Sequence, residues 1–397
     1  MCAAFSHIRR TSAQRVTMAT LDAQRTHAVN LDIQILALER SLTALPLAAL
    51  RARRTMVQDS LDSHKYPVLT LPNEIVSEIF IRFVPVYPER PSLDGIHSPI
   101  NLTHICQKWR DIALSTPELW RAIQLFVGDY GDIPVSLQVQ ELDTWLSRSR
   151  SCPFSIEVLS FNSLEGSFIF SAARAVHWEH LKASLMISPS STIEVPMPLL
   201  RHLDLILHST DVDPRVHPLV FGEAPLLRSV VLNDFAALMV ILPWVQLTSL
   251  TFRRAYPHKC DPVLKQTPNL VYCKLHLANH PPTTWPDVTL PCLESLSLVP
   301  ASLMHPIAQT RYLETFIVPA LCKLHIEETI LENPIDTLTS FILKSGCRLR
   351  EMYISGKRRV SREAYSQAFP SVKLSFDEDV GQVAGIASNT ESDSESL

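Results

Sequence analysis

The sequence predicts an α/β fold in which N-terminal helices precede a long array of short strands. Two patterns carry this prediction: apolar residues recur at helical spacing up to about residue 127, and the pattern L-x-x-L-x-L recurs after it. Composition is the third observation, because 46 % of the 397 residues are hydrophobic and only 19 % are charged. A chain of this length and apolar content can bury a large core.

Composition also excludes several functional classes. The chain has 29 prolines but only 9 glycines, and it lacks the glycine-rich dinucleotide and phosphate motifs and the G-x-S-x-G nucleophile elbow. A net charge of −4 gives no argument for a nucleic-acid partner. The best membrane candidate, the apolar run 236–245, is interrupted by Pro243 and is half the ~20 residues that a span needs. We therefore expect no nucleotide cofactor, no nucleic acid and no membrane as a partner.

The cysteines and histidines predict neither disulfides nor a metal site. Eight cysteines are scattered without one C-x-x-C pair, and no signal peptide is recognisable, which indicates reduced thiols in a cytoplasmic or nuclear protein. Two short clusters have ligand-type residues, one at His202, Asp204 and His208 and the other at Cys273, His276 and His280. Because Cys273 and His276 should point to opposite faces of a strand, we expect no metal.

The first 65 residues predict a disordered start and a helical segment. Residues 1–20 are rich in Arg, Ser and Thr without an apolar period, so they are expected to be disordered, and 21–65 are expected to be helical. An a/d seam with spacings of 4, 3, 4 and 3 runs through Leu31, Ile35, Leu38, Leu42 and Leu45. Pro46 ends this helix and lies in the first turn of a second. The seam fits a short coiled coil for self-association or a hairpin folded onto the next domain, and the proline favours the hairpin.

Residues 66–127 are predicted to form three short helices. Pro72 fits a first helical position, and Glu74 follows in the first turn, where an acid is favourable to the helix dipole. The second helix should lie around 100–114, and Thr116 should cap a third that starts at Pro117. Three helices of this size make a thin core, so the remaining apolar side chains indicate a partner.

The motifs in this segment resemble an F-box. The stretch L-P-x-E-I…I-F at 71–80 is followed by I-C-x-x-W-R at 105–110 and by L-W at 119–120. The sequence of this segment is most similar to that of F-box proteins of the type expanded in mushroom-forming fungi. These proteins commonly carry helices before the box and irregular leucine-rich repeats after it. An F-box docks the Skp-type adaptor of cullin–RING ubiquitin ligases. The resemblance implies these adaptor-binding residues: Leu71, Pro72, Ile75, Ile79, Leu102, Ile105, Trp109, Leu114 and Trp120.

Two points leave the adaptor contact open. The same residues could simply form a helical core. The chain also departs from the compact F-box by a proline-rich insertion at 84–99, which casts doubt on adaptor affinity.

Residues 133–376 are predicted to form an irregular leucine-rich-repeat solenoid. The pattern L-x-x-L-x-L starts at seven positions that are 27, 20, 23, 23, 28 and 28 residues apart: Leu200, Leu227, Leu247, Leu270, Leu293, Leu321 and Leu349. Leucine-rich repeats have periods of roughly 20–29 residues, and each supplies one strand stacked in parallel with its neighbours. Helical spacers are expected at 137–149 and after Asn333, and no asparagine ladder is present.

Alternate strand positions predict an exposed face that binds a protein substrate. Its polar, basic and aromatic side chains are of the types that anchor interfaces. The predicted face consists of His202, Asp204, Arg253, Tyr272, Lys274, His276, Lys323, His325, Glu327, Glu351 and Tyr353, accompanied by Ser229, Val231 and Asn233. The alternative is an ordinary solvated sheet face.

The whole chain is thus predicted to be an interaction protein and not an enzyme. The box would dock the Skp-type adaptor, and the repeat face would hold an unidentified protein substrate of an SCF-type ubiquitin ligase. The alternative is a leucine-rich-repeat scaffold without a ligase. Residues 377–397, with six acidic and no basic side chains, are expected to form a disordered acidic tail. No catalytic residue and no cofactor is expected.

Overall fold

The structure is a computed structural model that divides the chain into two compact units. It describes residues 12–39, 44–63, 70–93, 95–127, 134–160, 177–187, 196–209, 219–221, 223–279, 285–301 and 311–377. The units are Met1–Val76 and Ser77–Leu397, and the division falls inside helix α3 (Asn73–Ile81). The disorder expected for residues 1–11 and for most of the acidic tail lies outside the described residues.

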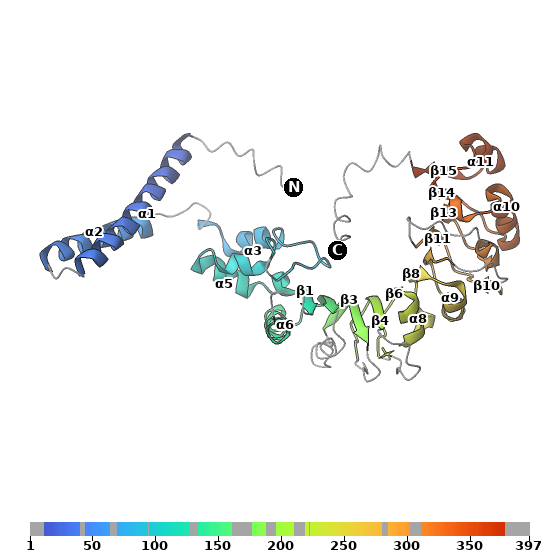
Figure 1. The fold of residues 1–397 in the computed structure, drawn as a ribbon, viewed down its shortest axis with the longest axis horizontal. Helices are drawn as coiled ribbons and strands as arrows, with labels where there is room; N and C mark the ends of the chain where they lie inside the picture. The colour runs from blue at the N-terminus through green and yellow to red at the C-terminus, as the bar shows by residue number, and fades with distance from the viewer. Residues whose placement is uncertain are drawn as a thin grey trace. The chain divides into compact units, whose positions relative to one another are not determined.

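The first unit contains an antiparallel pair of helices (Figure 1), α1 (Ser12–Glu39) and α2 (Ala44–Ser63). An ion pair joins them, with 2.5 Å between the Arg54 guanidinium and the Asp32 carboxylate. The two helices predicted around Pro46 are therefore present, and they form a hairpin. Self-association of this segment remains a prediction.

The seam and the start of α1 differ in how well they were predicted. Leu31 and Ile35 are buried as the seam requires, whereas Leu42 lies outside the described residues. The disorder predicted for 12–20 is wrong, because α1 begins at Ser12. Ala, Gln, Arg and Met are good helix formers, and several of them occur in 12–20, so intrinsic propensity extends the helix beyond its apolar pattern.

The predicted box contains four short helices where three were expected. They are α3, α4 (Pro99–Thr103), α5 (Gln107–Ser115) and the 3₁₀ helix η2 (Pro117–Trp120). The predicted second helix is split because Cys106 is extended and precedes α5. Thr116 does not cap the last helix with its side chain. Its hydroxyl instead donates to the Ile112 carbonyl at 2.7 Å and closes the end of α5.

The second unit is built on one large parallel sheet. Its strands neighbour each other in chain order. They are β1 (Ala122–Val127), β2 (Phe154–Ser160), β3 (Trp178–Ile187), β4 (His202–Ser209), β6 (Ser229–Leu232), β8 (Ser249–Ala255), β9 (Tyr272–Leu277), β11 (Ser295–Pro300), β13 (Lys323–Glu327), β14 (Glu351–Ser355) and β15 (Lys373–Phe376). Strand β1 thus joins the sheet, although the sequence placed 122–127 with the box.

The register of the sheet follows the leucine pattern. The same pattern position is paired across seven neighbouring strands: Leu203, Val230, Leu250, Cys273, Leu296, Leu324 and Met352. All seven side chains are buried. Seven predicted strands and their parallel stacking are therefore confirmed. The burial of all seven side chains also fits this register, since a one-residue slip would move every apolar side chain to the other face.

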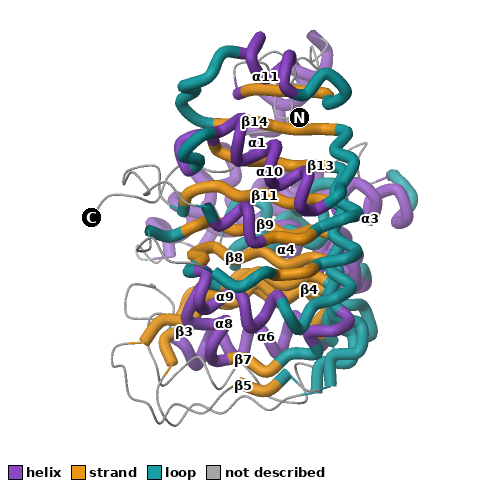
Figure 2. The backbone as a smooth tube through the Cα atoms, turned by 90° about the vertical axis from the view of Figure 1, so that its right-hand side faces the viewer, coloured by secondary structure: helices purple, strands orange, loops and turns teal. Residues whose placement is uncertain are grey.

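Helices cover one side of this sheet (Figures 1 and 2). They are α6 (Val135–Ser149), α8 (Asp234–Met239), α9 (Pro257–Leu264), α10 (Pro334–Ser345) and α11 (Arg362–Ala368), with the 3₁₀ turns η4 (Trp244–Gln246), η5 (Tyr312–Thr315) and η6 (Glu328–Ile330). Two further strand pairs are β5 (Leu219–Val220) with β7 (Val240–Ile241) and β10 (Val288–Thr289) with β12 (Phe316–Ile317). The core lies between these elements and the strands, and it leaves the opposite sheet face polar.

The first strand, β1, has its outer backbone groups bonded to side chains and loops. Gln124 N donates to the Pro91 carbonyl at 3.2 Å, and Ser92 forms a parallel bridge with Gln124. The Gln138 amide bonds both backbone groups of Phe126, and its oxygen accepts from Phe126 N at 2.9 Å.

A buried carboxylate, that of Glu328, joins the segment after β13 to the segment after β14. Glu328 is fully buried and accepts from Val360 N at 3.0 Å and from the Tyr365 hydroxyl at 2.9 Å. Arg359 N also donates to this carboxylate. A buried charge with several donors is satisfied, so Glu328 ties α11 to the preceding turn.

Candidate protein-binding surfaces

The predicted adaptor residues divide into an exposed and a buried group. Four apolar side chains are exposed by 38 to 58 %: Ile75, Ile79, Ile105 and Leu114. Pro72 is also exposed, and Leu71 and Trp109 are half-buried. Exposed aliphatic side chains of this size mark a surface that can bind a partner. We refer to the exposed Ile79, Ile105 and Leu114 of the second unit as the apolar helix surface.

Helix α3 shows how this division arises. Val76 and Phe80 lie one turn apart and are almost fully buried, whereas Ile75 and Ile79 lie one turn apart and are about half exposed. Residues four apart share a helix face. The helix therefore has two apolar faces, and packing within the described chain covers only one of them.

The buried members of the predicted set support the helices and do not reach a partner. Trp120 is fully buried, and its indole N–H donates to the Ala113 carbonyl at 2.8 Å. Leu102 is buried as well. The Trp109 ring packs edge-on against Phe80, with 4.9 Å between ring centroids. Leu102 and Trp120 thus lie in the core of the helices, which is one of the two roles that the sequence left open for them, because a small helical unit needs its largest side chains for its own core.

The insertion at 84–99 lies on the polar face of the first strands. The Tyr87 hydroxyl donates to Glu179 at 2.7 Å, and its ring meets His180 edge-on at 5.4 Å between centroids. The Arg121 guanidinium stacks on the same ring, 4.1 Å from its centroid. Ser155 Oγ donates to the Pro88 carbonyl at 2.8 Å. The insertion thus fastens the box helices to the sheet.

Arg90 of the insertion also contacts the polar face of the sheet. It lies 3.7 Å from the Glu157 carboxylate, which also pairs with Lys182 at 2.8 Å. Burial lowers the pKa of Arg90, while Glu157 and Asp204 raise it. We call the polar side chains around Tyr87 and Arg90 the covered half: Glu157, His180, Lys182, His202 and Asp204.

Two residues predicted to bind substrate belong to the covered half. Asp204 is only 6 % exposed and binds the Arg253 guanidinium at 2.7 Å. His202 Nδ1 lies 3.0 Å from Ser229 Oγ, and burial lowers its pKa. Asp204 is therefore largely closed to a substrate, whereas His202 is half-buried, as His276 and His325 are. Their pattern position alone could not show this.

The remaining predicted residues lie on a second part of the face. Strand register aligns Tyr272 with Lys323 and Glu351 through Ser295, and Lys274 with His325 and Tyr353 through Ser297. All of these side chains are exposed or half-buried except Ser297. We call Tyr272, Lys274, His276, His325 and Tyr353 the open half. The structure thus brings together these five of the eleven predicted face residues.

Hydrogen bonds fix the far side of the open half. His325 bridges Ser297 Oγ and Ser355 Oγ, at 3.1 Å each. Burial, reinforced by Lys274, lowers the pKa of His325. The Tyr353 hydroxyl donates to Asp377, and burial together with this bond raises the pKa of Tyr353 to about 12. Both side chains therefore present a neutral, fixed surface at neutral pH.

Other predicted face residues have structural partners. Glu327 accepts from the Thr329 hydroxyl at 2.6 Å and lies so close to Gly356 that a Cβ there would meet its Cγ at 2.6 Å. Gly356 has φ +81°, which also requires glycine. Lys323 and Glu351 pair at 3.2 Å. Asn233, expected on the exposed face, instead bonds both backbone groups of Leu207.

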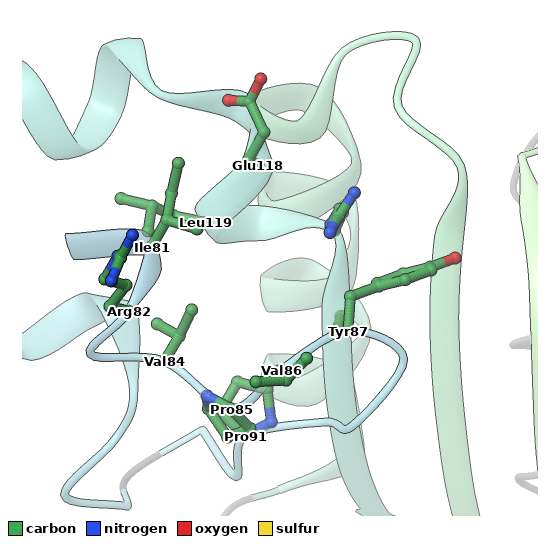
Figure 3. A pocket seen from close by; sticks show the side chains of 11 residues that line it. Ile81, Arg82, Val84, Pro85, Val86, Tyr87, Pro91, Glu118 and Leu119 are labelled. Carbon is green, nitrogen blue, oxygen red and sulfur yellow. The ribbon is translucent and has the colours of Figure 1, made fainter. Parts of the chain in front are cut away.

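A small cavity lies beneath the insertion (Figure 3). It holds about 190 Å³ and is walled by Ile81, Val84, Pro85, Val86 and Leu119. Charged side chains from Arg82, Glu118 and Arg121 also line it. Its lining offers no nucleophile next to a base, so this cavity suits an apolar side chain better than a reaction.

No metal-binding group was found among the described residues. His208 of the first short cluster lies 3.2 Å from Ser184, and His280 of the second lies outside the described residues. Cys273 is fully buried whereas His276 is half-buried, as expected for opposite faces of a strand. Within the described chain, no helix has the length and apolar character that crossing a membrane demands.

No protein-family model matches the chain, and no curated protein matches its sequence. The function is therefore argued from the apolar helix surface, the insertion and the open half.

Proposed function

We propose that the chain is the substrate-recognition subunit of an SCF-type ubiquitin ligase. In this proposal residues 66–127 are an F-box, the strands and their spacers form an irregular leucine-rich-repeat solenoid, and the open half binds a protein substrate. The Skp-type adaptor would bind the apolar helix surface. The protein would act in the cytoplasm or nucleus, where its partners are.

One observation carries the proposal. The insertion contacts the sheet through Tyr87 and Arg90, and helices α4 and α5 belong to the same compact unit as the open half. Two sites on one chain raise the effective concentration of a captured protein near the ubiquitin-charged machinery. The chain itself would perform no chemistry, and a protein substrate needs only affinity and orientation.

The exposed isoleucines support the adaptor contact. Burying one isoleucine contributes about 1.5–3 kcal/mol, and Ile79 and Ile105 are each about half exposed. Nothing in the described second unit covers them completely. An adaptor that buries both would gain affinity without disturbing Phe80 or Trp120, which hold the helices together from the other side.

Adaptor capture tests the proposal directly. The double variant Ile79→Asp with Ile105→Asp should bind a purified Skp-type adaptor at least ~10-fold more weakly in a pull-down or by calorimetry, because each 1.4 kcal/mol is about tenfold. The matched control is Leu238→Asp with Leu343→Asp, which places the same charges at exposed leucines of α8 and α10. This control should bind normally.

The alternative is a protein-binding scaffold that does not join a ligase. It is favoured if the wild-type chain, folded by circular dichroism, does not bind the adaptor at all. The insertion is the observation behind this alternative, because it makes the segment longer than a compact F-box.

A further inference from the structure

Lys274 is a cation without a carboxylate partner in the part of the chain that the structure describes. Other basic side chains on the same face are paired, Arg253 with Asp204 at 2.7 Å and Lys323 with Glu351 at 3.2 Å. Lys274 lies near the middle of the sheet, on strand β9. Its register neighbours are Thr251 on β8 and Ser297 on β11, and both carry hydroxyls.

The surroundings of Lys274 are electropositive. His276 follows two residues later on the same face and is half-buried. Burial, together with the neighbouring Lys274, Arg253 and His325, lowers its pKa to about 4, and no carboxylate of the described residues raises it. Such a surface disfavours a proton and favours an anion.

We propose that Lys274, with His276 and the Thr251 hydroxyl, forms a subsite that binds one carboxylate side chain of an acidic peptide segment. The ammonium supplies up to three donors, the neutral imidazole supplies one N–H, and the hydroxyl can turn to donate. Charge-assisted hydrogen bonds of this kind are about twice as strong as neutral ones. The partner is the captured protein, so its identity as a ligase substrate rests on the proposed function.

The charge count selects a carboxylate over other anions. One ammonium beside neutral histidines balances a single negative charge, whereas a phosphoryl group usually recruits arginines. The nearest arginine, Arg253, is held by Asp204. Nucleic acid would need many cations along its backbone, and Glu327 and Glu351 lie on the same face. A protein segment rich in Glu or Asp fits this surface best.

The acidic end of the chain is a second possible source of carboxylates. Lys274 lies four strands from β15, or about 19 Å at ~4.8 Å per strand. The 20 residues after Asp377 could span up to ~70 Å if extended. The test must therefore separate a partner from this tail.

Fluorescence anisotropy of a labelled eight-residue glutamate peptide, titrated with the full chain, tests the subsite. We expect the variant Lys274→Met to weaken binding about tenfold, whereas Lys323→Met, which breaks a paired lysine on the same face, should change it less than about twofold. A glutamine peptide of the same length should not bind. Equal binding by Lys274→Met and wild type, or equal binding of the glutamine peptide, overturns the proposal.

Two further arms separate the sources and the two proposals. A chain shortened to residue 377 should bind the glutamate peptide as the full chain does; markedly tighter binding would assign the subsite to the tail and overturn its assignment to a partner. The ring protons of His276, followed by NMR, should show a raised pKa in the presence of the glutamate peptide. Lys274→Met should still bind the Skp-type adaptor. If the wild-type chain binds the glutamate peptide but not the Skp-type adaptor, the result contradicts only the proposed function.

Discussion

The covered half and the open half have the same strand pattern, but different elements lie on them. In the covered half, Glu157, His180 and Asp204 are in contact with the insertion or close to its Arg90. In the open half, Lys274 and His276 have no such cover in the described chain. The same strand pattern therefore places polar side chains in two environments. Near the box they contact the insertion, and beyond it those with partners in the described chain bond to neighbouring strands and loops.

The largest expected effect is on the insertion. Tyr87→Ala removes the ring that contacts His180 and Arg121 and the hydrogen bond to Glu179. We expect a loss of about 2–3 kcal/mol in the free energy of unfolding, as for other large-to-small changes at packed sites. Urea unfolding measures it. Val86→Ala, at the exposed neighbouring residue, is the control and should cost less than about 0.5 kcal/mol. Equal losses would mean that the insertion does not fasten the sheet.

A smaller effect separates a buried from an exposed ion pair. Asp204→Asn leaves Arg253 without its carboxylate in the covered half, and we expect a loss of about 1–2 kcal/mol. Glu351→Gln breaks the pair with Lys323, whose two side chains are exposed, and should cost less than about 0.5 kcal/mol. Urea unfolding midpoints compare the two variants. If Glu351→Gln costs as much as Asp204→Asn, the two halves do not differ in burial as described.

The smallest expected effect is a loss of folding stability as the pH falls. Burial, together with Lys274, Arg253 and His325, lowers the pKa of His276 to about 4 in the folded chain, below the ~6.5 of an unfolded histidine. The unfolded chain therefore takes up the proton first, so stability is full above about pH 6.5 and falls between about pH 6.5 and 4. We expect a loss of about 1 kcal/mol from His276 after solvent screening, measured by urea unfolding at pH 7.5 and 4.5.

The control for acid lies in the covered half. His276→Gln should flatten the decline, whereas His202→Gln should flatten it less, because Asp204 raises the pKa of His202 against the effect of burial. An unchanged decline in His276→Gln would contradict the electrostatics of the open half.

The strands were predictable because their signal is local and periodic. Leu203, Val230 and Leu250 pair across neighbouring strands as the repeat spacing requires. The contacts of the insertion with the sheet were not predictable in this way, since Tyr87 and Glu179 are 92 residues apart and no period links them. The same limit applies to the candidate site.

Which apolar side chains of the box are exposed depends on tertiary packing. Ile79 and Phe80 are adjacent and both apolar, yet one is half exposed and the other buried. Sequence alone placed both on a helix but could not show which face its neighbours would cover. In the same way, Lys274 was correctly placed on the polar face, whereas the sequence could not show which basic side chains of that face have a carboxylate partner, as Arg253 has in Asp204.

The contacts along β1 have a consequence for how the protein behaves in a crowded solution. An edge strand presents free N–H and C=O groups that invite a second chain to add as another strand, which leads to aggregation. Gln138 bonds both backbone groups of Phe126 as a neighbouring strand would, and Pro91 accepts from Gln124. These groups are therefore closed to an added strand, so the sheet cannot easily grow at this end. The insertion, through Pro91, and helix α6, through Gln138, thus also protect the protein against aggregation by strand addition.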